Sequence, residues 1–382
     1  MITERNPLSV PTVKAITLQD IADRCKLDKT TVSRALRDDR KRVNAQTIQF
    51  VHEIADEMGY DPSRHFAARQ LALQRMGRRQ LTHTVATFFP RLTRTPHTFQ
   101  DPYYRHIYLG IVDEIMAAGF GLLTIDLDID TKTRITPAPY FASGFVDGVI
   151  TMGLTKELPV FFSYLREKVQ VDFPVVSVLH EFSPYPSVQA DDRQGAYLVA
   201  DHLLALGHRH LLHFQPGDSV LSVNRLTGYH EAYAAHGLSP EVYLHSCPDW
   251  TEYTFQQPGH ADDARLVLRQ ALQRWPYLTG ILANNDLWAE KLAECLAQLA
   301  IAVPEQMSLV GFDDTRIDMP DALGTKQLTT VRVPLEEIGR RGALLLLDLI
   351  QKPVLQRLHA VDRSILPVQL VVRTSTAPPR ER

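Results

Sequence analysis

An alternation of short apolar runs with helix-length segments, from residue 83 onward, constrains the fold more than any other feature of the sequence. The runs are rich in β-branched, aliphatic and aromatic residues, and they read TVATFFP, FGLLTID, GFVDGVITM, FPVVSVL, HLLHFQP, GILANN and MSLVGFDD. Strands that are apolar throughout are typical of a parallel sheet with helices on both faces. Because there are too many runs for one small sheet, we predict an α/β body of two doubly wound parallel-sheet subdomains.

A different pattern, typical of three short helices, occupies residues 16–62. Thr17, Asp28 and Asn44 each stand where they can cap the start of a helix, and Gly59 can end the third one. Apolar residues recur at helical spacing from Leu18, and a second helix over 29–36 follows after a tight turn. This arrangement predicts an N-terminal all-α helix-turn-helix head.

The charge is distributed unevenly between these two parts. Residues 1–80 carry a net charge of +5, whereas the remainder carries −8, and the whole chain carries −3. A basic head on an acidic body indicates that a polyanion meets the head alone.

The second helix of the head carries the candidate DNA contacts. In a helix-turn-helix module this helix enters the major groove, and Lys or Arg donates to guanine while Thr contacts a base edge or a thymine methyl group. Hydroxyl side chains suit phosphate contacts. A small three-helix unit with a solvated basic face is the alternative reading. The candidate contacts on this helix are Lys29, Thr30, Thr31, Ser33, Arg34 and Arg37.

Residues 63–80 predict a short hinge helix followed by a basic linker. Arg69 is a candidate DNA contact, and a protruding Leu71 could wedge between base steps in the minor groove and kink the duplex. The alternative is that Leu71 is an ordinary packing residue of a linker helix.

Composition and missing motifs exclude several classes of protein. Hydrophobic residues make up 45% and charged residues 22% of the 382 residues, which excludes a mostly disordered chain. No apolar stretch approaches the ~20 residues of a membrane helix, and the three cysteines form neither a disulfide framework nor a metal-binding pair. Phosphate-loop, zinc-protease and serine-hydrolase motifs are absent from the sequence. We therefore expect a cytoplasmic protein without catalytic residues, metal or cofactor.

Short motifs are spread over the head and the body. They are 17–22 (TLQDIA), 31–36 (TVSRAL), 58–62 (MGYDP), 68–71 (ARQL), 206–210 (LGHRH), 225–229 (RLTGY), 285–286 (ND), 311–314 (GFDD), 328–332 (LTTVR), 339–341 (GRR) and 366–373 (LPVQLVVR). In this order they resemble the motifs of the lactose-repressor (LacI/GalR) family of bacterial transcription regulators, and the likeness covers roughly residues 16–378. One departure is Lys26, which stands where the family usually has Gly in the turn.

The resemblance implies a homodimer, or a dimer of such dimers, that binds a pseudo-palindromic operator in double-stranded DNA. It also implies a body like that of periplasmic sugar-binding proteins, with a small effector between the two subdomains. We expect a flexible leader (1–15), the helix-turn-helix domain (16–62), the hinge helix and linker (63–80), the effector-binding and dimerisation domain (81–378) and a tail (379–382). The body would divide into an N-subdomain (about 81–189 and 334–362) and a C-subdomain (about 190–333 and 363–378).

The positions that match the family's ligand loops supply the chemistry that a sugar requires. A sugar needs bidentate polar groups for its hydroxyls and an aromatic face for its C–H side. Each residue also has a structural alternative: Trp250 could be a core aromatic, Asp313 could cap a turn, and Arg225 could form a structural ion pair. By resemblance, the effector-binding residues are Tyr103, Tyr104, Arg225, Trp250, Asn285 and Asp313.

The sequence therefore predicts a DNA-binding transcriptional regulator, a repressor of carbohydrate-utilisation genes whose operator affinity is switched by a sugar. One alternative keeps the class but replaces the sugar with a purine or another non-sugar corepressor. A second alternative is a small-molecule sensor or hydrolase with a degenerate head.

Overall fold

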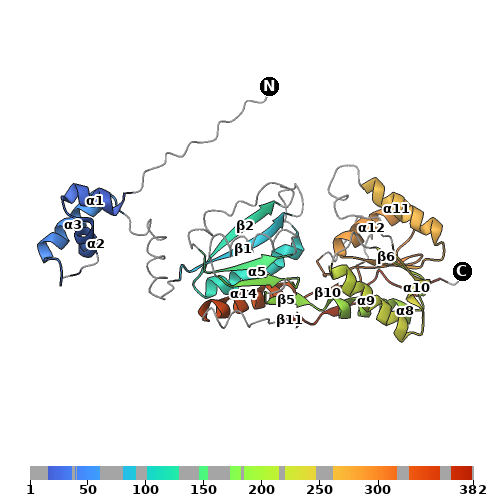
Figure 1. Cartoon of the computed structure of the whole chain (residues 1–382). Helices are drawn as coiled ribbons and strands as arrows, with labels where there is room; N and C mark the ends of the chain where they lie inside the picture. The colour runs from blue at the N-terminus through green and yellow to red at the C-terminus, as the bar shows by residue number, and fades with distance from the viewer. Residues whose placement is uncertain are drawn as a thin grey trace, which may run out of the picture. The chain divides into compact units, whose positions relative to one another are not determined.

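The computed structural model describes residues 16–36, 39, 41–60, 81–91, 101–128, 146–153, 173–181, 185–214, 220–246, 261–315, 327–352 and 363–380. The chain forms two compact units, residues 1–80 and 81–382, whose described helices and strands are drawn in Figure 1. We call the first unit the head and the second the body.

The described part of the head consists of α1 (Leu18–Cys25), α2 (Lys29–Ala35) and α3 (Ala45–Glu57). Each helix begins at the predicted cap: the side chains of Thr17, Asp28 and Asn44 accept hydrogen bonds from backbone N–H groups in the first turn. Asp20 completes a capping box with Thr17. The predicted helix-turn-helix fold is confirmed. Its core contains Ile21, Ala22, Cys25, Val32, Ala35, Val43, Ile48, Val51 and Ala55.

Lys26 ends α1 in the left-handed region, with φ of 55° and ψ of 38°. Only Gly enters this region without steric cost, because a Cβ crowds the backbone there. The turn that joins α1 to α2 therefore keeps the backbone of a glycine but carries a lysine.

The first part of the body is a six-stranded parallel sheet in the order β11-β5-β4-β3-β1-β2. Helices α5 (Pro102–Ala117) and α14 (Leu335–Gln351) pack against each other beside this sheet (Figure 1). The strands are β1 (Thr84–Arg91), β2 (Gly121–Asp128), β3 (Gly148–Met152), β4 (Val175–Val178), β5 (Ser187–Ala190) and β11 (Arg363–Leu366).

The second part of the body is a four-stranded parallel sheet in the order β7-β6-β8-β9. Successive residues of β6 point to opposite faces: Leu211 joins the hydrophobic cluster with α8 and α9, and Leu212 joins the cluster with α11 and α12. The strands are β6 (Leu211–Phe214), β7 (Leu244–Ser246), β8 (Gly280–Ala283) and β9 (Ser308–Val310). The helices are α8 (Asp192–Ala205), α9 (Val220–Ala235), α10 (Pro240–Tyr243), α11 (Ala261–Arg274) and α12 (Asp286–Gln298). The predicted pair of parallel-sheet subdomains is confirmed.

The chain passes between the two sheets at three places: from β5 to α8, from β10 (Thr330–Arg332) to α14, and from β11 to β12 (Gln369–Val371). β10 and β12 form a small antiparallel sheet that the sequence pattern did not predict. β11 belongs to the six-stranded sheet, so the third passage follows Leu366 rather than residue 362.

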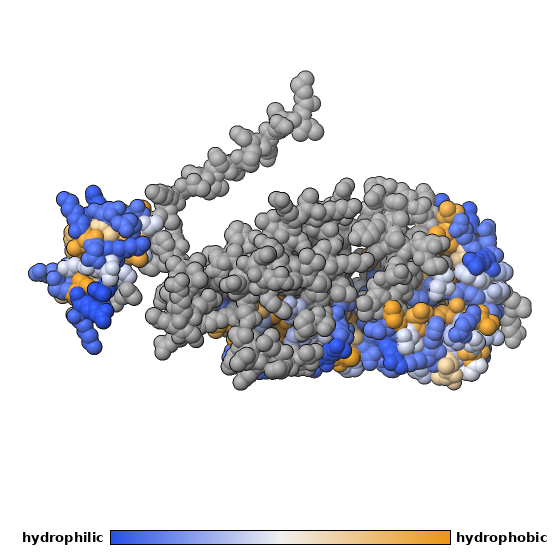
Figure 2. All heavy atoms as spheres, in the orientation of Figure 1, coloured by the Kyte–Doolittle hydropathy of each residue, from blue (hydrophilic) through white to orange (hydrophobic). Residues whose placement is uncertain are grey.

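The surface drawn in Figure 2 mixes hydrophilic and hydrophobic side chains over the described part of the chain. Scattered exposed apolar residues are normal for a folded protein. Within the described residues, every helix is too short or too polar to cross a membrane.

Candidate functional site

The head presents the N-terminal end of α2 to its surroundings. Lys29 and Thr30 are exposed there, and Arg34 is half-buried one turn later. The Thr31 hydroxyl donates to the carboxylate of Asp28, so in this structure it supports the helix cap. Ser33 is half-buried. Of the other predicted contacts, Arg37, Arg69 and Leu71 lie outside the described residues.

Arg225 of α9 is held in place on three sides within the body. Its Nε and Nη2 atoms donate to Oδ1 of Asp192 at 2.8 and 2.6 Å, and Nη1 donates to the backbone oxygen of Asn284. The guanidinium lies 3.6 Å from the ring centroid of Phe312. Both members of the ion pair are buried, with 4% and 6% of Arg225 and Asp192 exposed. In this structure Arg225 therefore forms the ion pair that the sequence offered as its structural alternative.

The glycine of the RLTGY motif explains how Arg225 reaches Asp192. A Cβ on Gly228 would overlap the backbone oxygen of Arg193 and crowd the backbone of Tyr197. α9 therefore lies against the first turns of α8, and Asp192 stands at the beginning of that helix. A larger side chain at residue 228 would separate the two helices and with them the ion pair.

Asp313 provides a buried carboxylate next to this pair. Only 7% of Asp313 is exposed, and none of the described residues donates a hydrogen bond to its side chain. Burial raises its pKa well above the ordinary value, and Asp286 and Asp192 raise it further, while Arg225 acts in the opposite direction. A buried acceptor without a donor is costly, which marks Asp313 as a place for a ligand's donor group.

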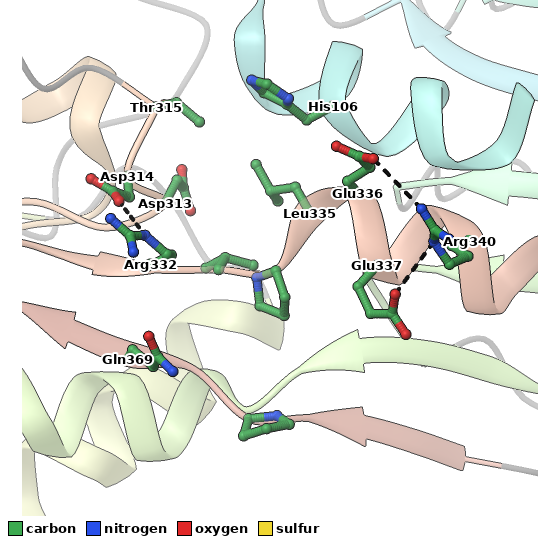
Figure 3. A pocket seen from close by; sticks show the side chains of 13 residues that line it. His106, Asp313, Asp314, Thr315, Arg332, Leu335, Glu336, Glu337, Arg340 and Gln369 are labelled. Carbon is green, nitrogen blue, oxygen red and sulfur yellow. Dashed lines mark hydrogen bonds and ion pairs between the residues drawn. The ribbon is translucent and has the colours of Figure 1, made fainter. Parts of the chain in front are cut away.

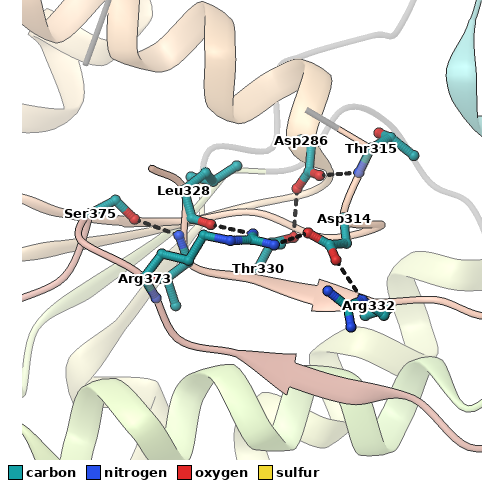
Figure 4. A network of polar contacts seen from close by, with 9 residues as sticks. Asp286, Asp314, Thr315, Leu328, Thr330, Arg332, Arg373 and Ser375 are labelled. Carbon is teal, nitrogen blue, oxygen red and sulfur yellow. Dashed lines mark hydrogen bonds and ion pairs between the residues drawn. The ribbon is translucent and has the colours of Figure 1, made fainter. Parts of the chain in front are cut away.

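Asp313 lies in a strained turn that its neighbours hold in shape. Asp313 and Asp314 have φ values of 107° and 59°, which non-glycine residues rarely adopt. The Asp314 carboxylate accepts hydrogen bonds from Arg332 Nε and Arg373 Nη2, both at 2.6 Å (Figure 4). The N–H of Thr315 donates to Asp286 at 2.7 Å. Strain of this kind gathers at functional sites.

Tyr103 approaches this cluster from the first turn of α5. Its backbone N–H donates to the capping side chain of Asp101 at 3.0 Å. Burial raises the pKa of the Tyr103 hydroxyl well above its usual value, and the Asp313 carboxylate raises it further. Tyr104 packs edge-on against Tyr103, with ring centroids 5.2 Å apart. The structure thus brings Tyr103, Arg225 and Asp313 together.

Asn285 and Trp250 are the two remaining residues that were predicted to bind the effector. The side chain of Asn285 caps α12 and accepts a hydrogen bond from the N–H of Trp288 at 2.9 Å. Trp250 lies outside the described residues.

The sequence motifs did not reveal His180, which follows β4. Its Nδ1 is buried without a hydrogen-bond partner among the described residues. Burial lowers the pKa of His180 to about 4, and the charge of Arg225 contributes to this shift. Asp192 was also missed as a partner of Arg225. The available signal was position, because ligands gather at the carboxyl ends of parallel strands.

A pocket of about 540 Å³ adjoins Asp313 (Figure 3). Its walls come from both parts of the body and include His106, Asp313, Arg332, Glu336, Arg340 and Gln369. In the described ranges, His, Cys, Asp and Glu side chains form no group suited to a metal ion.

Comparisons with known proteins agree with this architecture. Residues 17–63 match the family model described as bacterial regulatory proteins, lacI family, and residues 200–376 match that of the periplasmic binding protein-like domain. A helix-turn-helix head on such a body defines a DNA-binding transcriptional regulator rather than an enzyme. The chain therefore carries a helix-turn-helix domain of the lacI type and a periplasmic binding protein-like domain.

The relatives support this assignment along almost the whole chain. DegA of Bacillus subtilis, an HTH-type transcriptional regulator, is 27% identical over 366 residues, 95% of this chain and 98% of that protein. The transcriptional repressor CytR of Escherichia coli is 28% identical over 95% of this chain and 96% of its own length.

Solved structures share the fold. The complex of the regulator CelR with cellobiose has a TM-score of 0.61 at 24% identity, covering 94% of this chain and 99% of that one. The lac repressor dimer bound to operator and the anti-inducer ONPF has a TM-score of 0.58 at 20% identity, covering 95% and 100%.

Proposed function

We propose that the protein is a repressor whose affinity for an operator is switched by a small neutral sugar held between the two parts of the body. One observation carries the proposal: the carboxylate of Asp313 is buried without a described donor, beside Arg225 and facing Tyr103. A ligand hydroxyl would donate to Asp313, and the Tyr103 ring offers an aromatic face.

The charges of the cluster favour an uncharged ligand. Arg225 is already neutralised by Asp192, and Asp286 places further negative charge near Asp313. A ligand carboxylate or phosphate would be repelled by this negative charge. Among the described residues of the cluster, no unpaired cationic side chain is present to compensate it. Several relatives agree with a sugar ligand: CelR was solved with cellobiose, an Enterococcus faecium regulator was solved with ribose, and a Geobacillus stearothermophilus relative is an arabinose metabolism repressor.

We propose that α2 reads the operator in the major groove. Lys29, Thr30 and Arg34 would contact bases, and Thr31, Ser33 and Arg37 would position the helix on phosphates. Arg69 and Leu71 would act in the minor groove as the sequence predicts. Such a regulator works in the cytoplasm, where its operator lies.

We further propose a homodimer that binds a two-fold symmetric site. Leu109 and Met116 of α5 and Leu344 of α14 are exposed by 43%, 65% and 48%, and these two helices pack side by side. They offer an apolar face that a second copy of the chain would cover. Two heads would then read two half-sites.

The switch follows from linkage. A ligand that contacts Tyr103 on one side and Asp313 on the other binds more tightly when the two parts of the body are close together. It therefore shifts the population toward that state, and the heads bind DNA differently in the two states.

The experiment is selection of bound duplexes from a randomised pool by the full chain, at ~150 mM salt so that phosphate attraction alone is suppressed. It is run without ligand, with neutral sugars and with nucleosides. We expect one two-fold symmetric site, enriched differently with sugars and without. A response to nucleosides alone would assign the purine alternative, and no enrichment in any arm would contradict the proposal.

A further inference from the structure

The pocket beside Asp313 has no role in the function proposed so far. It is lined by α5, the turn at 313–315, the passage from β10 to α14 and the passage from β11 to β12 (Figure 3). At about 540 Å³ it falls within the usual size range of small-molecule sites, roughly 300–1,000 Å³.

Apart from Asp313, the acidic side chains and the arginines of the pocket are already paired with one another. Arg332 donates to Asp314, and Arg340 lies within 3.7 Å of Glu336 and 3.5 Å of Glu337. A charged ligand would have to break these ion pairs and would leave one partner uncompensated. The pocket therefore disfavours an ionic ligand.

Three other hydrogen-bonding side chains remain open to a ligand. His106, Thr315 and Gln369 line the pocket from three different elements, and no other described residue bonds to their side chains. The apolar part of the lining consists of Val333, Pro334, Leu335 and Pro367. Polar groups from several directions around an apolar surface match a ring with hydroxyl edges and C–H faces.

Two features join the pocket to the effector cluster. Tyr103 and His106 are three residues apart on α5, so they lie on the same side of the helix. Asp313 lines the pocket, its charge raises the pKa of Tyr103, and the charge of Arg225 lowers the pKa of Asp313. Gln369 and Arg332 are cross-strand partners of β12 and β10, so they line the same part of the pocket.

We propose that this pocket is a second subsite of the effector site and binds a further neutral polyhydroxylated ring, so that the effector has at least two sugar units. This inference rests on the proposed sugar effector. The first ring contacts Tyr103, Arg225 and Asp313, and the second contacts His106, Thr315 and Gln369.

The test is calorimetric titration of the full chain with cellobiose, maltose, lactose, sucrose and trehalose, and with their component monosaccharides. We expect at least one disaccharide to bind about tenfold or more tightly than either component. Gln369→Ala and His106→Ala should weaken that disaccharide about tenfold and leave the monosaccharide unchanged. Arg105→Ala, at the exposed neighbouring position on α5, is the matched control and should change neither affinity.

The outcomes separate this inference from the function it rests on. If monosaccharides bind as tightly as every disaccharide, or if Gln369→Ala and His106→Ala weaken both equally, the second subsite is wrong and the sugar effector stands. If no neutral saccharide binds the wild-type chain, the sugar effector fails and the subsite fails with it.

Discussion

Lys26 adopts a backbone conformation that favours glycine over any residue with a side chain. A non-glycine residue in the left-handed region costs about 1 kcal/mol. We therefore expect Lys26→Gly to stabilise the head by up to about 1 kcal/mol, measured by chemical denaturation of the full chain with a probe on the head. An exposed lysine elsewhere in the head, Lys41, serves as control in Lys41→Gly, and a loss of stability in Lys26→Gly would contradict the expectation.

Asp313 and Arg225 belong to one cluster but should respond differently to substitution. Arg225→Ala leaves Asp192 as a buried unpaired charge and should cost about 3–5 kcal/mol of body stability in addition to the ligand response. Asp313→Asn removes no described hydrogen bond, so it should abolish the ligand response while operator affinity without ligand is kept. Normal ligand response in Asp313→Asn would show that the site is elsewhere.

His213 of β6 gives the stability of the body a predictable pH dependence. Burial lowers its pKa to about 3, whereas the unfolded chain has an ordinary value near ~6.5. Between these values the unfolded state binds the extra proton, so stability is lost as the pH falls from about 6.5 toward 3. We expect this group to cost about 2 kcal/mol at pH 5 relative to pH 7.

Tryptophan fluorescence during urea unfolding checks the pH effect, because all three tryptophans lie in the body. His213→Phe should reduce the difference between pH 7 and pH 5 by about that amount, and the exposed His230→Gln should not. Equal pH dependence in all three proteins would contradict the assignment.

The close contact between helices α5 and α14 depends on two glycines. A Cβ on Gly339 would overlap the backbone oxygen of Ile107, and one on Gly110 would overlap that of Glu336. Gly339→Ala should therefore destabilise the body by about 1–3 kcal/mol, because the helices must separate. Gln351→Ala, at the exposed end of α14, should change stability by less than about 0.5 kcal/mol. A neutral Gly339→Ala, measured by urea unfolding, would contradict the close packing.

The elements that the sequence predicted are those with strong local signals. The caps Thr17, Asp28 and Asn44 marked the helices of the head, and the continuous apolar runs marked the central strands. β7, β10 and β12 are only three residues long, and partly exposed patterns give them no periodicity. Their position depends on pairing between distant segments, which no local pattern encodes.

The candidate site, too, could be predicted only in part from the sequence. The RLTGY and GFDD motifs located Arg225 and Asp313, because a motif keeps its residues at fixed spacing. Asp192 and His180 come from other segments, and only the folded chain brings them to Arg225. The positive φ of Asp313 could not be read from the sequence either, since the turn is held by Arg332 and Arg373.

In the whole molecule, the proposed switch requires that the body and the head share one conformational equilibrium. Three passages of the chain connect the two sheets, and the carboxylate of Asp314 binds Arg332 at the end of β10 and Arg373. Ligand binding and operator binding are then coupled by a single free energy, which must act in both directions.

The most direct test of this claim is to measure that coupling both ways with the wild-type chain, the selected duplex and the sugar that binds it. The operator Kd is determined with and without saturating sugar, and the sugar Kd with and without saturating operator. The account predicts that both change by the same factor, about 5–150-fold. A sugar that binds the body and leaves the operator Kd unchanged would contradict it.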